Sequence, residues 1–151
     1  MLRHTLATLA YRAGKVVRDA PPGFSDFRAS PDSRSAGEIL AHMGDLFDWA
    51  ISIVDGRTAW KNATPQAWDA DVQRWFDTLA RFDEQLAGAT LSEQLERQVF
   101  QGPIADALQH TGQLALLRRL AGGPIAAENY FVAEIVEGRV GSQQARARRE
   151  F

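Results

Sequence analysis

The sequence predicts an all-α protein, a four-helix bundle, and three observations support this prediction. Apolar residues recur at spacings of three and four over four stretches of the chain, which is the period of an amphipathic helix. Proline and glycine clusters separate these stretches, and no alternating run of strand length occurs. Amphipathic helices that each bury one apolar face pack together as a bundle, and 151 residues suffice for one such domain.

The first two helices have recognisable limits in the sequence. The first ends before Pro21-Pro22-Gly23 and carries an apolar stripe of Leu2, Leu6, Leu9, Ala13 and Val16. The second opens with Ser35 and Glu38, which have the spacing of a capping box, where two side chains satisfy free backbone N–H groups. Its apolar stripe continues to Val54, and Gly56 ends the helix.

The third helix has the cleanest helical period in the chain. We expect it to begin at Thr64-Pro65, with threonine as the N-cap and proline at the first helical position. Its aromatic-rich stripe is predicted to pack in the core and not to serve as a stacking platform; it consists of Trp68, Val72, Trp75, Phe76, Leu79, Phe82 and Leu86.

A short helical segment is expected over residues 90–99, ahead of the fourth helix. The fourth helix is predicted to begin at Gly102-Pro103 and to end at Leu120, before a Gly-Gly-Pro run. Residues 126–136 form a weaker helical segment. Residues 1–137 are therefore expected to make up the bundle domain, and residues 138–151 a flexible basic tail whose charges are solvated.

Composition excludes several classes of function. The net charge of −2 provides no electrostatic footprint for nucleic acid, so no nucleic-acid partner is expected. The chain has no cysteine, which excludes disulfides, thiolate catalysis and cysteine-based zinc sites. Arg3, His4, Arg12 and Lys15 interrupt the N-terminal segment, so it does not look like a signal peptide, and no apolar run is long enough for a bilayer. We expect a cytoplasmic protein without a membrane partner.

The fourth helix breaks the apolar pattern in an informative way. At about 100° per residue, Asp106, His110 and Gln113 fall on one strip that runs through the middle of an apolar face. Arg118 and Arg119 are expected to project into solvent. A buried carboxylate needs a partner or a metal ion, and residues at i and i+4 can point at one position. Asp106 and His110 are therefore either two metal ligands or a buried ion pair.

The second helix offers a third ligand, His42, at the edge of its apolar stripe. Two imidazoles and a carboxylate form a donor set that zinc, nickel or iron(II) accepts, with coordination positions left open. The alternative is a hydrogen-bonded core histidine. His4, the remaining histidine, lies opposite the first helix's apolar stripe and is expected to face solvent.

These residues resemble a known family. The stretch from Asp106 to Ile125, DALQHTGQLALLRRLAGGPI, is similar to the fourth-helix signature of the DinB/YfiT-like metalloenzymes, in which a His-x-x-x-His pair precedes Gly-Gln and Leu-Arg-Arg. The segment around His42 resembles the family's second helix, which carries the earlier histidine. The resemblance covers the chain from Met1 to about Glu137. One position departs from the pattern, since Asp106 stands where the family has histidine.

The resemblance implies an up-down-down-up bundle, a homodimer and a metal triad of His42, Asp106 and His110. It also implies a metal-dependent enzyme acting on a small molecule, either a hydrolase or a transferase that uses a low-molecular-weight thiol. Zinc or nickel is the expected ion, with iron as a further option. Gln113 is a candidate for orienting a ligand and Trp49 for walling the pocket, although a gap-filling role and a core role are the alternatives. A metal-binding or structural dimeric bundle without catalysis is the competing hypothesis.

Overall fold

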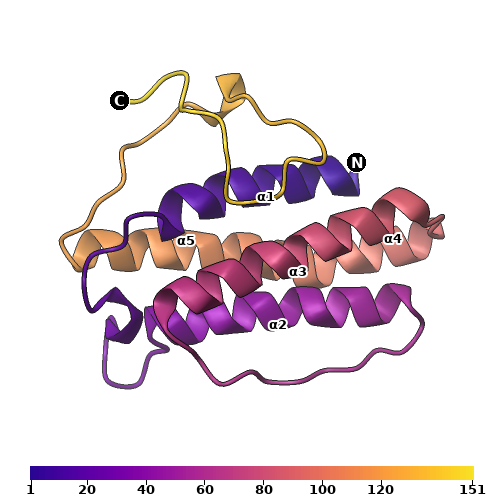
Figure 1. The fold of residues 1–151 in the computed structure, drawn as a ribbon, viewed down its shortest axis with the longest axis horizontal. Coiled ribbons are helices and arrows are strands. Elements are labelled where there is room, and N and C mark those ends of the chain that lie inside the picture. Colours follow the sequence, from indigo (N-terminus) through magenta and orange to yellow (C-terminus); the bar gives the residue numbers. More distant parts are fainter.

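The structure, a computed structural model, describes all 151 residues and is all-helical, as predicted. Figure 1 shows the long helices lying side by side, with the C-terminal segment folded back over α1. The helices are α1 (Leu2–Val17), α2 (Ala36–Val54), α3 (Trp68–Gly88), α4 (Glu93–Val99) and α5 (Ala105–Leu120), with short 3-10 turns at Phe24–Asp26 and Tyr130–Val132. None of these helices has the length and apolar character that a membrane span requires.

The apolar stripes predicted from the sequence form one continuous core. Twenty-six buried residues belong to it, and the stripe of α3 contributes Trp75, Phe76, Leu79 and Phe82. Phe47 of α2 contacts both Trp75 and Phe82 with ring centroids 5.2 and 5.7 Å away, so the aromatic residues of α3 are core residues as predicted. His4 is exposed, which is also as predicted.

Contacts between the helices show their relative directions. Arg74 and Gln85 of α3 contact Asp45 and Asp55 of α2, respectively, so α2 and α3 run in the same direction. The connection between them, residues 55–67, consequently returns along the bundle, where Figure 1 shows it as the long loop beside α2. Trp49 of α2 lies near Gly102, whereas His42 lies near His110, so α2 and α5 are antiparallel.

The N-terminus of α2 is formed as the sequence predicts. The Ser35 hydroxyl accepts a hydrogen bond from the Glu38 backbone N–H at 3.2 Å, and the Glu38 carboxylate accepts one from the Ser35 N–H at 2.7 Å. The start of α3 was predicted wrongly. It begins at Trp68 with Ala67 as its N-cap, and Asp71 in its first turn accepts a hydrogen bond from the backbone N–H of Gln66, which lies ahead of the helix.

Two further predictions about helix boundaries are wrong. Gly102 and Pro103 do not start a helix, because they lie inside a π-turn (Phe100–Ile104) that joins α4 to α5 without a break. A π-turn has a wider hydrogen-bonding pattern, which accommodates a residue that lacks a backbone N–H. Residues 126–136 contain only the 3-10 turn and a β-bridge between Glu128 and Glu150.

The C-terminal segment, residues 138–151, lies beside α1 (Figure 1). Lys15 of α1 contacts the carboxylates of Glu128 and Glu150 at 2.9 and 2.7 Å, and Tyr11 donates a hydrogen bond to Glu128 at 2.5 Å. Val140 is buried in the core. These contacts attach the segment to α1, and its flexibility stays a prediction.

Arg118 was expected in solvent, and this prediction is wrong, because the side chain is buried. Its guanidinium donates hydrogen bonds of 2.6–3.1 Å to four backbone carbonyls, those of Val16, Arg18, Asp19 and Gly123. Three of these carbonyls belong to the C-terminal end of α1, where backbone oxygens lack partners within the helix and carry partial negative charge. Helical periodicity predicts a direction for a side chain but not the acceptors it meets.

Candidate metal centre

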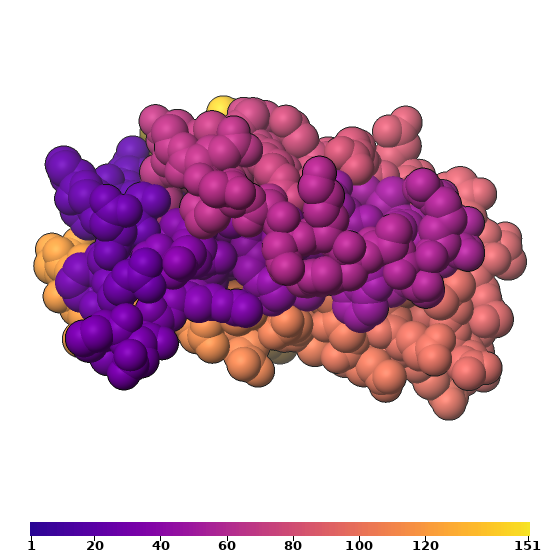
Figure 2. Space-filling model, turned by 90° about the horizontal axis from the view of Figure 1, so that it is seen from below, coloured from indigo at the N-terminus to yellow at the C-terminus, as the bar shows by residue number.

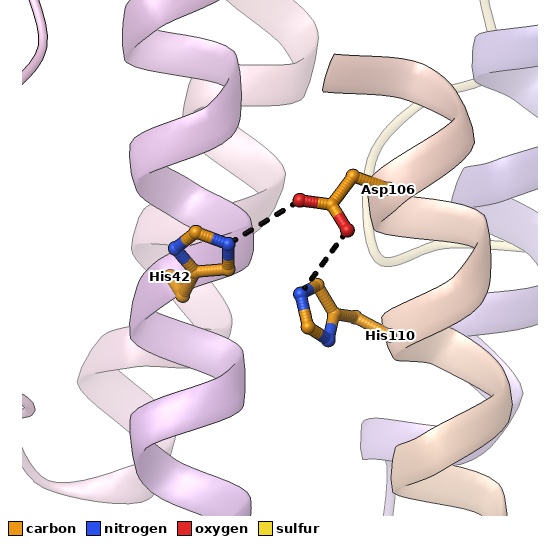
Figure 3. A group of neighbouring side chains, drawn as sticks. All are labelled: His42, Asp106 and His110. Carbon is orange, nitrogen blue, oxygen red and sulfur yellow. Dashed lines mark hydrogen bonds and ion pairs between the residues drawn. The ribbon is translucent and has the colours of Figure 1, made fainter. Parts of the chain in front are cut away.

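The three predicted ligands come together between α2 and α5. His42 projects from α2, and Asp106 and His110 from successive turns of α5, toward one position (Figure 3). One potential ligand atom from each residue lies within 4.8 Å of the other two. The spatial convergence that the i and i+4 spacing predicts is present, and ligation of a metal ion itself stays a prediction.

Each histidine contacts a different oxygen of the Asp106 carboxylate, at a distance longer than that of most hydrogen bonds. His42 Nε2 lies 3.4 Å from Asp106 Oδ2, and His110 Nε2 lies 3.4 Å from Asp106 Oδ1. Charge-assisted hydrogen bonds between these groups are about 2.7–2.9 Å long. An ion with bonds of about 2.0–2.1 Å and tetrahedral angles separates its ligand atoms by about 3.3–3.4 Å. Binding would require the widest separation in the cluster, up to 4.8 Å, to shorten.

Gln113 orients the ring of His110. Gln113 Oε1 lies 2.7 Å from His110 Nδ1 and can accept a hydrogen bond from a proton on this nitrogen. Nε2 then carries the lone pair and faces Asp106 and His42. A ligating histidine usually has such a partner on its second nitrogen, which fixes the tautomer and the ring orientation. Whether Gln113 orients a ligand through this contact or only fills a polar gap stays a prediction.

The surroundings of His42 favour its neutral form. Burial is the main cause that lowers the pKa of His42, and the positive charge of Arg34 and the nearby His110 lower it further. Asp106 acts in the opposite direction through its hydrogen bond and charge. A neutral imidazole has a nitrogen lone pair available for a metal, so at neutral pH His42 needs to lose no proton to bind one.

Exposure differs across the cluster and leaves one side open. The side chain of His110 is 9% exposed and that of His42 17%, whereas that of Asp106 is 40% exposed. Leu114 and Ala107, on one side of the polar strip of α5, are buried, but Leu116 and Leu120, on its other side, are more than half exposed. The strip therefore lies at the edge of the buried face and not in its middle, which gives the cluster access to solvent.

Cavities flank the cluster on two sides. One, of about 350 Å³, is lined by Asp106 and includes Trp49, so the predicted wall residue does line a cavity at the site. The other, of about 400 Å³, is lined by His110. An open coordination position with adjoining space is what distinguishes a catalytic metal site from a closed structural one.

Trp60 is a site residue that the sequence did not reveal. Its ring centroid lies 5.6 Å from that of His42 and 5.7 Å from that of Trp49, in edge-to-face arrangements. Trp60 belongs to the loop between α2 and α3, which has no periodicity from which a position could be inferred. The loop is attached to α2 on both sides of Trp60, by Ser52 Oγ to the Ala59 N–H (2.9 Å) and by Asp45 to the Ala63 N–H (3.0 Å).

Arg74 of α3 fixes the turn of α2 that carries His42. Its guanidinium donates to the carbonyl oxygen of Ala41 at 3.0 Å and to the carboxylate of Asp45 at 2.7 Å. Gly44 permits this approach, since a Cβ there would lie 2.6 Å from Arg74 Nη1. The turn of α2 that carries His42 is thus held by a largely buried ion pair between α2 and α3.

Comparisons of the chain with protein-family models, with curated proteins and with solved structures found no match. Membership of the DinB/YfiT-like family therefore stays a prediction.

Proposed function

We propose that this chain is a DinB/YfiT-like protein that binds one divalent metal ion through His42 Nε2, Asp106 and His110 Nε2. The observation that carries the proposal is the convergence of these three groups, with their ligand atoms within 4.8 Å of one another. The proposal includes the up-down-down-up topology, the homodimer and the cytoplasmic location expected above. The parallel course of α2 and α3 supports the topology.

The donor set fits zinc best. Two imidazole nitrogens and a carboxylate suit zinc and nickel, and the absence of cysteine removes the soft thiolate ligands. Zinc in proteins accepts three such ligands and leaves a further coordination position open, which is the number of donors that the cluster offers. Aspartate in place of the family's histidine adds a negative charge that offsets part of the metal's own charge.

The site favours catalysis over a purely structural role. A bound divalent ion would lower the pKa of a water molecule or thiol and supply a nucleophile near neutral pH. The residues of the chain would hold this group: His42 and His110 as neutral donors, Gln113 through its bond to His110, and Trp60 as a wall against water. The exposed side of Asp106 and the two cavities leave room for a small substrate. A hydrolase or a thiol S-transferase is the proposed reaction type.

Metal content tests the proposal directly. Protein purified without chelators is expected to contain one equivalent of metal by elemental analysis, and His110→Ala is expected to contain almost none. His4→Ala is the matched control, since it removes an exposed histidine on α1 and should retain the metal. Wild-type protein without stoichiometric metal, even after incubation with zinc or nickel, would rule out the site.

Activity separates the enzyme from the non-catalytic metal protein. Metal-loaded wild-type protein is expected to turn over members of ester or thiol-acceptor panels, and removal of the metal should abolish this turnover. Metal that raises the melting temperature in the absence of any turnover would support the non-catalytic bundle.

A further inference from the structure

The cavity on the His110 side of the cluster has a distinctive composition. It has a volume of about 400 Å³ and lies between the chain preceding α2, the first turn of α2 and the second half of α5. Figure 2 shows the face on which the purple chain before α2 meets the orange end of α5. Ligand cavities commonly have volumes from about 300 Å³ upward, so a small organic molecule fits.

The wall of this cavity is mostly apolar. Ile39 and Leu117 are almost fully buried and contribute to it, and the half-exposed Leu116 forms its outer part. An exposed leucine that lines a cavity gains free energy when a hydrocarbon group covers it. The wall therefore fits the hydrocarbon part of a ligand.

One cation, Arg34, lines the same cavity. It is exposed and makes no ion pair or hydrogen bond within the chain, although most other arginines of the protein do. Arg28, in the same loop, is paired with Glu38 at 2.9 Å. No carboxylate lines the cavity, so the charge of Arg34 is uncompensated where it borders the apolar wall.

We propose that this cavity binds a small apolar carboxylate, with its carboxylate on Arg34 and its hydrocarbon part against Ile39, Leu116 and Leu117. A single guanidinium matches a single negative charge and can donate two parallel hydrogen bonds to one carboxylate. The far end of such a ligand would lie beside His110, which lines the cavity. The binding of this ligand does not depend on the proposed metal function.

Calorimetric titration with octanoate and octanol tests the proposal on full-length, metal-free and zinc-loaded protein. Octanoate is expected to bind at least about tenfold more tightly than octanol, and Arg34→Gln is expected to weaken octanoate about tenfold while leaving octanol unchanged. Arg97→Gln is the matched control, because it removes the same charge from an exposed position on α4 that lines neither cavity at the site. It should bind octanoate as wild type does.

Several results would overturn the proposal. Equal affinities for octanoate and octanol would do so, as would an octanoate affinity that Arg34→Gln leaves unchanged. Octanoate binding that requires zinc and is unaffected by Arg34→Gln would place the carboxylate on the metal and would also overturn it. A second variant, Leu117→Asn, should lower the affinity for both octanoate and octanol, because it reduces the apolar area that the ligand's hydrocarbon part can cover. Octanoate binding that depends on Arg34, in a wild-type protein that takes up no zinc or nickel, would uphold this proposal while the metal site fails, so the two failures are distinguishable.

Discussion

Replacing Arg118 with methionine is expected to destabilise the protein without affecting the metal site. Methionine retains most of the apolar stem but removes the donors of four hydrogen bonds to backbone carbonyls. The bond to Val16 is fully buried and the other three are partly buried. The buried charge-assisted bond contributes about 1.5–3 kcal/mol and each of the other three about 0.5 kcal/mol, so losing all four should lower the free energy of unfolding by about 3–4.5 kcal/mol.

One opposing effect reduces this sum. Burial lowers the pKa of Arg118, which means that the folded state bears a cost for holding the charge, and methionine removes that cost. We therefore expect a loss of about 2–4 kcal/mol in the free energy of unfolding. For a chain of this size the melting temperature should fall by about 4–16 °C.

Urea unfolding followed by far-UV circular dichroism at 25 °C measures this loss. Arg119→Met is the matched control, because the neighbouring arginine is exposed and makes one long bond of 3.3 Å to Ala115, so its effect should stay within about 0.5 kcal/mol. Metal content of Arg118→Met should equal that of wild type. An Arg118→Met protein as stable as Arg119→Met would refute the reasoning that these carbonyls depend on the guanidinium.

Three further predictions concern stability. Free zinc at a hundred times its dissociation constant should stabilise wild type and His4→Ala by about 2.7 kcal/mol and raise their melting temperatures by about 5–11 °C. His110→Ala should show no such rise, and an equal rise in all three proteins would indicate that zinc binds elsewhere. Ser35→Ala removes one half of the capping box and should cost about 1 kcal/mol in urea unfolding, whereas an unchanged midpoint would contradict the role of the cap. Burial, followed by the hydrogen bond to Glu128, raises the pKa of Tyr11, so the folded state holds the phenolic proton longer than the unfolded state does. The contribution of Tyr11 to the free energy of unfolding is therefore complete below about pH 10 and decreases as the pH rises above it. The urea midpoint of Tyr11→Phe should decline less steeply with alkaline pH than that of wild type, and equal slopes in the two proteins would exclude this contribution.

Local signals in the sequence predicted the elements well. The apolar period located α1, α2, α3 and α5, and the Ser35–Glu38 spacing predicted the cap of α2 because both halves of that interaction lie within one turn. The convergence of Asp106 and His110 could also be predicted, since a helix places residues at i and i+4 on one side. The edge of the apolar stripe made His42 a candidate only, and the resemblance to a family supported it, because sequence spacing does not relate residues that lie 64 positions apart on different helices.

Features that depend on contacts distant in sequence were missed. Arg118 looked solvated because its acceptors lie about a hundred residues away. Pro103 looked like a helix start because proline usually breaks a regular helix, whereas it lies buried inside the π-turn that joins α4 to α5. Trp60 and Arg34 lie in loops, where neither periodicity nor capping predicts a position.

The attachment of the α2–α3 loop to α2 limits how far Trp60 can move. The two anchors on α2, Ser52 and Asp45, are seven residues apart and hence separated by about 10–11 Å along the helix. The loop covers this span in four residue steps, from Ala59 to Ala63, whose fully extended length is only about 13–14 Å. Because the extended length only slightly exceeds the span, the backbone at Trp60 can move only a short distance. Loosening either anchor should therefore make the Trp60 indole markedly easier for a soluble quencher such as acrylamide to reach.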